Sequence, residues 1–203
     1  ETKTIDGTPY TVHRAYDLLG RLTTLTYPDN EQAQYTYNLQ GGLETVDLTS
    51  ATLPLRHLVT AVTYNAAGQV TKIVYGNGVV SDYTYHPQTL RLDQLKTAGP
   101  SGILQDFRYT FDGVGNVTQL QDAVHTGTQS FTYDGLHRLT RAQGAYGTAT
   151  YGYDPLGNLT HKEGATLTYP TTGSPRPHAV SGLQSPVSSL SFTYDANGNL
   201  VSK

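Results

Sequence analysis

The chain has 203 residues, and only 14% of them are charged, against about 25% in an average globular protein. Its net charge of -3, without any basic stripe, argues against a nucleic-acid partner. Cysteine is absent, which excludes disulfides and a thiol nucleophile, and no apolar run approaches the roughly 18 residues of a membrane span. Because methionine and a signal peptide are also missing, we expect a piece of a longer protein.

One phrase, an aromatic residue followed two positions later by Tyr-Asp or a close variant, recurs along the chain. Aligned on the position of the second aromatic, the copies stand in chain order at Tyr16, Tyr37, Tyr64, Tyr85, Phe111, Tyr133, Tyr153 and Tyr194, of which Tyr16 and Tyr64 lack the first aromatic. The last interval is twice as long as the others and leaves room for a degenerate copy near Tyr169. A period of about 21 residues holds two strands of about six residues and two turns. The repetition predicts an extended scaffold whose function lies in the surface it builds.

The copy at residues 151–160 shows why each unit should fold as a β-hairpin. Tyr151 and Tyr153 are two residues apart, so both point to one face of a strand. The residues that follow, Asp154-Pro155-Leu156-Gly157, have the chemistry of a type I turn whose glycine can take a left-handed conformation. Leu159 and Thr160 then open the return strand.

We therefore predict that the aspartate and glycine of each copy set a turn and that the aromatic residues pack the sheet. The predicted turn residues are Asp17, Gly20, Asp112, Gly115, Asp134, Asp154, Gly157, Asp195 and Gly198. The predicted packing residues are Tyr37, Tyr64, Tyr85, Phe111, Tyr133, Tyr153 and Tyr194.

Several copies depart from this pattern. Asn38 and Asn65 replace the aspartate, His137 stands where glycine is usual, and residues 85–91 have lost the Asp-x-x-Gly core. Two stretches, 45–60 and 170–189, break the rhythm and are predicted to be long connections or short irregular strands. Residues 55–62 are the only weak candidate for a helix.

Together these patterns predict an all-β fold of consecutive antiparallel hairpins that forms a curved, twisted sheet. Residues 1–203 are predicted to be a single repeat segment. The exposed edges of such a sheet should be covered by neighbouring repeats of the parent chain or by another copy of this chain.

The phrase Tyr-Asp-x-x-Gly-Asn/Arg-Leu-Thr resembles the signature of the RHS/YD-repeat family. Matching stretches stand at 16–23, 111–118, 131–140, 151–160 and 192–201, and the resemblance covers nearly the whole chain. It implies a strip of hairpins that spirals into a hollow β-shell, of which this chain would form a part. In bacterial toxins of the family the shell encloses a toxic domain, and in the animal teneurins it belongs to an adhesion ectodomain.

The resemblance thus implies a non-catalytic segment of a secreted or cell-surface protein of bacterial origin, with an enclosed or presented toxin domain as its partner. The family's self-cleaving core continues from Tyr-Asp-Pro-x-x-Gly into Arg-Phe, whereas residues 153–157 continue here into Asn158-Leu159-Thr160. No autoproteolytic residue therefore carries over. The alternative is an adhesion or carbohydrate-binding module that uses the tyrosine-rich face, since aromatic rings can also stack on sugars.

Other site chemistries have simpler explanations. Residues 112–116 and 195–199 resemble oxygen-rich calcium loops, but they lack the later glutamate and the flanking helices of an EF-hand. The seven histidines form no His-x-x-x-His pair, and there is no Gly-x-Ser-x-Gly elbow. The glycosylation sequons at 116–118 and 158–160 arise from the repeat itself. We predict no catalytic residue, no metal site and no cofactor.

Overall fold

The computed structural model describes all residues from 1 to 203 and contains only strands, turns and loops. The predicted all-β fold of successive hairpins is confirmed. The chain divides into two compact units, residues 1–108 with 122–125, and residues 109–121 with 126–203. No helix is present that is long and apolar enough to cross a membrane.

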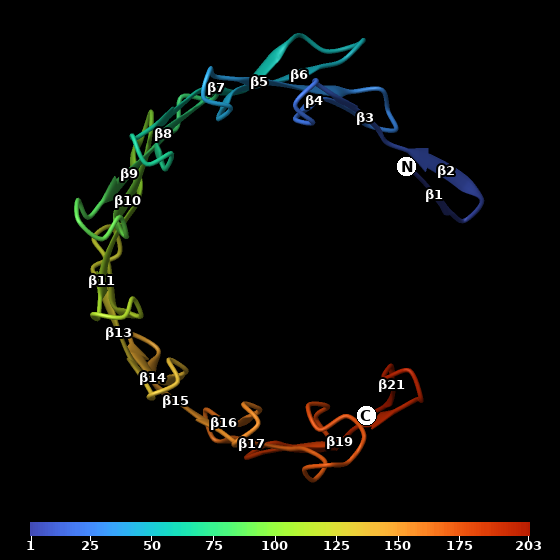
Figure 1. Cartoon of the computed structure of the whole chain (residues 1–203), viewed down its shortest axis with the longest axis vertical. Helices are drawn as coiled ribbons and strands as arrows, with labels where there is room; N and C mark the ends of the chain where they lie inside the picture. The colour runs from blue at the N-terminus through green and yellow to red at the C-terminus, as the bar shows by residue number, and fades with distance from the viewer. The chain divides into compact units, whose positions relative to one another are not determined.

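The first unit is an antiparallel sheet in which each strand from β3 onward pairs with the next one along the chain. The hairpin of β1 and β2 forms a separate two-stranded sheet. Figure 1 shows these strands, from blue to green, following one another along a curved sheet. The strands are β1 (Thr2–Ile5), β2 (Thr8–Thr11), β3 (His13–Tyr16), β4 (Leu22–Thr26), β5 (Gln32–Tyr37), β6 (Leu43–Thr49), β7 (Arg56–Tyr64), β8 (Val70–Tyr75), β9 (Val80–Tyr85), β10 (Leu92–Gly99) and β11 (Gly102–Phe111).

The second unit repeats this arrangement. Its strands from β13 to β19 pair consecutively and antiparallel, and β20 and β21 form a hairpin of their own. The strands are β12 (Val117–Asp122), β13 (Gly127–Tyr133), β14 (Leu139–Gly144), β15 (Gly147–Tyr153), β16 (Leu159–Lys162), β17 (Ala165–Thr168), β18 (Gly182–Ser185), β19 (Ser188–Ser191), β20 (Thr193–Tyr194) and β21 (Leu200–Ser202).

A register shift recurs beside the second aromatic residue of the repeats. In the β13–β14 hairpin Thr132 pairs with Arg141 while Tyr133 pairs with Leu139, so that Thr140 is an extra residue on the return strand. The same shift stands at Tyr16, Tyr37, Tyr64, Tyr153 and Tyr194. Because a bulge bends its strand and increases the local twist, each repeat contributes to the twist of the sheet.

The sheet is one layer thick and has two different faces. Along β13 the aromatic positions are half-buried and the threonines exposed. On the threonine face, hydroxyls on the two strands of a hairpin lie within hydrogen-bond distance, as between Thr36 and Thr45 at 2.7 Å.

The sheet leaves much of its surface exposed to solvent. The chain exposes 13202 Å², whereas a compact globular protein of 22.0 kDa would expose about 9,300 Å². The buried apolar side chains are few and small: Ala33, Val46, Ala142 and Ala149.

The first irregular stretch is mostly strand, whereas the second is mostly connection. Strand β6 continues to Thr49 and β7 begins at Arg56, so that only residues 50–55 connect them. Residues 55–62 lie almost entirely in β7, where Val62 pairs with Ile73, and the weak helix prediction is therefore wrong. In the second stretch, residues 169–181 form a loop and the β18–β19 hairpin follows.

Gly76 allows a close approach between the turn after β8 and strand β7. Its N–H donates to the carbonyl of Leu58 at 3.2 Å, and a Cβ here would overlap the carbonyl oxygen of His57. We expect Gly76→Ala to lower the free energy of unfolding by about 1–3 kcal/mol, because backbone must move to make room. Gly135→Ala is the control, since a Cβ there meets no atom within 4 Å. Urea denaturation measures both, and equal losses would contradict the close approach.

Candidate functional site

The Tyr-Asp phrases form a recurring turn, which we call the YD turn and define as residues 17–21, 38–42, 65–69, 112–116, 134–138, 154–158 and 195–199. In the turn at 134–138, Asp134 Oδ1 accepts the N–H groups of Leu136 and Arg138 at 2.9 and 3.0 Å. The N–H of His137 donates to the carbonyl of Asp134 at 3.0 Å. Arg138 Nε donates to Asp134 Oδ2 at 2.7 Å. One carboxylate thus closes the turn through both of its oxygens.

The same bonds recur in the other YD turns. In every one the fifth residue donates its N–H to the side-chain oxygen of the first. The second carboxylate oxygen accepts from the side chain of the fifth residue in five of them, namely at Arg21, Asn116, Arg138, Asn158 and Asn199. The structure places the predicted turn aspartates Asp17, Asp112, Asp134, Asp154 and Asp195 at the first position.

The fourth position of each YD turn requires positive φ. Gly157 takes φ +87° there, and His137 takes φ 61° in the copy that lacks the glycine. An L-residue with a side chain adopts this region less readily than glycine does, although histidine is among the more tolerant residues. The predicted turn glycines Gly20, Gly115, Gly157 and Gly198 all occupy this position.

Hydrogen bonds in the turns stabilise the ionised carboxylates. The Arg138 side chain, and then its backbone N–H, lower the pKa of Asp134. The side-chain amide of the fifth residue is the leading cause that lowers the pKa of Asp112 and of Asp195. For Asp154, burial opposes the shift most strongly, but the bonds from Asn158 still lower the pKa. The YD turns are therefore strongest when their aspartates are charged.

Residues 86–91 form a turn that replaces the lost Asp-x-x-Gly core in an unexpected way. His86 Nδ1 lies 3.3 Å from the N–H groups of both Gln88 and Thr89 and accepts from them as a carboxylate oxygen would. The turn is one residue longer, and Leu90 supplies the left-handed residue at φ 55°. This turn was not predicted from the sequence, because histidine is not among the residues that usually accept hydrogen bonds in turns.

The aromatic residues of the repeats do more than pack. Tyr133 donates its hydroxyl proton to the carbonyl of Val117, the first strand residue after the preceding YD turn, at 2.8 Å. Seven tyrosines, which we call the tyrosine ladder, donate in this way across 2.7–3.0 Å: Tyr37 to Leu22, Tyr64 to Leu43, Tyr85 to Val70, Tyr133 to Val117, Tyr153 to Leu139, Tyr169 to Leu159 and Tyr194 to Val180. Each bond ties one hairpin to the one before it.

One member of the predicted aromatic set, Phe111, and one residue outside it, Tyr169, qualify this picture. Phe111 has no hydroxyl and cannot donate such a bond; its ring stacks on that of Tyr109 with centroids 6.5 Å apart. Tyr169, expected only as a degenerate copy, is a full member of the ladder. A repeat is therefore marked more reliably by its tyrosine than by its Asp-x-x-Gly core.

The fifth residue of the YD turn links the turn to the ladder tyrosine of the following hairpin. The guanidinium of Arg138 lies 4.5 Å from the centroid of the Tyr153 ring, and that of Arg21 lies 4.6 Å from Tyr37. Such contacts contribute about 0.5–1 kcal/mol at exposed sites. An aspartate, an arginine and the tyrosine of the following hairpin therefore act as one connected group.

Asparagine makes a different link in the turn at 154–158. Asn158 Nδ2 donates to Asp154 Oδ2 and to the carbonyl of Pro177, and Asn158 Oδ1 lies 2.7 Å from His178 Nδ1. With 8% of its surface exposed, Asn158 is one of the few buried polar residues. The proline-rich loop at 169–181 thus docks on a YD turn. The Asn158 side chain, which a glycosylation sequon would modify, is held by these hydrogen bonds.

The chemistry of these groups is structural. Both oxygens of the YD aspartates accept turn donors, which accounts for the stretches that resembled calcium loops. No group of three or more histidine, aspartate or glutamate side chains is placed to hold a metal ion. The close His–Asp pairs, His57 with Asp47 and His125 with Asp122, carry histidines that are 55% and 76% exposed. The arrangement can fix one hairpin to the next.

Removing one hydroxyl of the ladder tests its energetic role. We expect Tyr133→Phe to lower the free energy of unfolding by about 0.5–1.5 kcal/mol, because the carbonyl of Val117 loses a donor while the ring still packs. Tyr146→Phe is the matched control, since Tyr146 is 57% exposed and lies outside the ladder. Chemical denaturation gives both values. Equal stability of Tyr133→Phe and wild type would show that the ladder bonds contribute nothing.

The lowered pKa values predict acid sensitivity. A carboxylate with a lowered pKa stabilises the fold above its ordinary pKa, about 3.9, and this stabilisation is lost as the pH falls through the folded-state pKa. The free energy of unfolding should therefore decline below about pH 4. Asp134→Asn should be less stable at neutral pH and decline less steeply in acid, because it keeps the turn acceptor but not the charge.

The control for this titration is Asp93→Asn, which changes an exposed aspartate in β10 outside the YD turns. Thermal denaturation between pH 2 and 7 measures the two variants and the wild type. If Asp134→Asn follows the same acid curve as Asp93→Asn, the turn carboxylates are not the origin of the acid sensitivity.

Comparison with known proteins gives relatives over almost the whole chain. No protein-family model matches it. It is 32% identical over 205 residues to the toxin subunit YenC2 of Yersinia entomophaga, and 30% identical over 206 residues to YenC1 of the same organism. Both alignments cover 95% of this chain and 20% of the relative, so the chain spans about a fifth of the length of these proteins.

Solved structures show the same fold. The crystal structure of TcdB2-TccC3-Cdc42 matches with a TM-score of 0.74 at 23% identity, and the Photorhabdus luminescens Tc holotoxin pore matches with 0.72 at 24%. Each match covers 95% of this chain and 12% of the other. The chain is thus a homologue of toxin subunits, and these relatives are consistent with the RHS/YD-repeat family, as are the repeated YD turns and the tyrosine ladder.

Proposed function

We propose that this segment is a non-catalytic wall element of a secreted bacterial toxin-complex subunit, part of a spiral β-shell that encloses or presents a toxin domain. The tyrosine ladder carries the proposal, because each hairpin is bonded to the previous one by the same contact. A contact that repeats with the chain lets a sheet extend without a thick core. The toxin-subunit relatives support the same function.

The mechanism is steric. A continuous antiparallel sheet satisfies the backbone hydrogen bonds between its strands and leaves no gap for a protease to enter. The YD turns close one edge of each hairpin, and the ladder joins each hairpin to its neighbour. In this proposal the toxin domain on the inner side stays shielded until the wall opens, and neighbouring repeats or another copy of the chain cover the remaining edges.

Glycan binding through the tyrosine-rich face has less support. The ladder tyrosines donate their hydroxyls to backbone carbonyls, and burial raises the pKa of Tyr133 and Tyr169 above its ordinary value. These rings are half-buried members of the sheet. A sugar platform built on the ladder would have to use rings whose hydroxyls already bind within the sheet.

Limited proteolysis of the full-length parent protein tests the wall. The enclosed toxin domain should be cleaved slowly in the wild type and faster in a Tyr133→Phe/Tyr153→Phe variant, because two ladder bonds are lost. Tyr146→Phe should behave as the wild type. The proposal fails if the toxin domain is cleaved in the intact parent as fast as when expressed alone. Selective binding on a glycan array, abolished by the double variant, would favour the adhesion alternative.

A further inference from the structure

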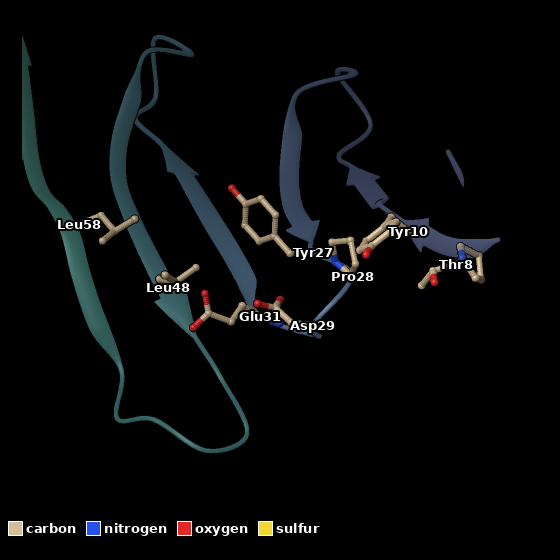
Figure 2. Close-up of a pocket in the computed structure, with 9 residues that line it drawn as sticks. Thr8, Tyr10, Tyr27, Pro28, Asp29, Glu31, Leu48 and Leu58 are labelled. Carbon is tan, nitrogen blue, oxygen red and sulfur yellow. Dashed lines mark hydrogen bonds between the residues drawn. The ribbon is translucent and has the colours of Figure 1, made fainter. Parts of the chain in front are cut away.

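An open groove lies on the aromatic face of the first unit, at the edge opposite the YD turns. Its volume is about 740 Å³, within the usual range for ligand sites. Tyr10, Tyr27, Leu48 and Leu58 supply its apolar surface, and Asp29 and Glu31 lie along one side. Figure 2 shows Leu58, Leu48 and Tyr27 following one another across the strands, with both carboxylates nearby. We call this feature the acidic groove.

Strand alternation explains why these side chains share a face. Leu48 on β6 pairs with Ala33 on β5, which pairs with Leu25 on β4. Tyr27 stands two residues after Leu25, and Glu31 stands two residues before Ala33, so both project to the side of Leu48. Ala33 lies between Leu25 and Leu48 in the sheet and is only 3% exposed, so its larger neighbours cover it.

The groove is apolar and uncovered. Tyr10, Tyr27 and Leu58 are 45%, 39% and 42% exposed, although each has a large apolar side chain. These two tyrosines are not members of the tyrosine ladder, so their rings are not committed to holding hairpins together. Exposed apolar side chains that gather in one concave place mark an interaction site more often than scattered ones do.

The charge around the groove is negative. Residues 1–66 contain seven acidic and four basic residues, whereas residues 67–203 contain nine of each. Glu31 is paired with Arg56 at 2.7 Å, which leaves Asp29 as the uncompensated charge on the rim. Asp29 Oδ1 accepts the N–H of Glu31, so its carboxylate is held in place beside the apolar surface. This charge distribution favours a cationic partner and repels an acidic one.

We propose that the acidic groove binds an amphipathic, basic helical segment of another protein, with leucine-type side chains on one face and lysine or arginine beside them. Leu48 and Leu58 stand on neighbouring strands, which are about 4.8 Å apart in a sheet. Side chains three or four positions apart on a helix are separated by roughly 5–6 Å. Arg56 is the register partner of Leu48, so Leu58 is displaced along β7 and a helix must lie obliquely across the strands to place its apolar side chains against both leucines. A neutral sugar would leave these leucines without a matching surface.

Fluorescence anisotropy with a labelled 14-residue peptide of leucine and lysine, patterned to be amphipathic as a helix, tests the groove on the complete chain. We expect saturable binding that weakens as salt is added, because the rim is charged. Leu58→Ser and Tyr27→Ser should each raise the Kd about tenfold. Asp29→Asn keeps the turn acceptor and should raise the Kd and reduce its salt dependence. The same peptide with glutamate in place of lysine should not bind.

Matched controls lie on the same unit. Leu39→Ser changes a leucine that is fully exposed in a YD turn, and Glu44→Gln removes an acidic charge from β6 outside the groove. Both should bind the peptide as the wild type does, and circular dichroism checks that every variant is folded. Equal weakening by groove and control variants would overturn the proposal. So would glycan binding that Tyr27→Ser abolishes, or self-association in sedimentation that Leu58→Ser abolishes, since a sugar or a second copy would then be the occupant.

Discussion

The bond from a tyrosine hydroxyl to the carbonyl of the preceding repeat is the contact on which this structure depends. A sheet one layer thick buries only a few small apolar side chains, so a hydrophobic core cannot hold its hairpins together. The inter-hairpin bond must come from the sheet itself. Tyrosine suits this role because its ring covers apolar surface while its hydroxyl satisfies a carbonyl. Substitution by phenylalanine keeps the apolar ring and loses the hydroxyl that donates to the carbonyl.

The YD turn needs a side-chain acceptor more than it needs an aspartate. Asn38 and Asn65 keep the bonds from the side-chain oxygen to the turn N–H groups, and His86 replaces that oxygen with a ring nitrogen. The aspartate adds a second anionic oxygen, which fixes the arginine or asparagine that reaches the next hairpin. In the turn at 65–69 an amide makes a similar link, because Asn65 Nδ2 donates to Gln69 Oε1 while Gln69 Nε2 donates to the carbonyl of Leu90 in the next turn. The turn at 38–42 ends in Gly42, which has no side chain to make such a link.

The sequence was sufficient to predict the fold and the turns, because their causes are local. Paired aromatics two residues apart and Asp-x-x-Gly predict a hairpin wherever they stand. The ladder acceptors could not be predicted, since the partner of Tyr133 lies 16 residues away and the register includes a bulge. The contact between His178 and Asn158, which are 20 residues apart, could not be predicted for the same reason. The acidic groove combines side chains from separate strands and became visible only with the sheet register.

The edge of the sheet that carries the YD turns and the opposite edge differ in how freely their residues can be substituted. At the YD edge, the first, fourth and fifth residues of the turns take part in a set of bonds that links to the ladder, so a change at these positions weakens the sheet. At the opposite edge the connections differ in length and sequence, as at residues 6–7, 27–31, 75–79 and 163–164. These turns close their hairpins without the aspartate-to-ladder linkage. Apart from Gly76, whose close approach to β7 restricts it, residues at this edge can change their surface chemistry at little cost in stability, and it is there that the acidic groove lies.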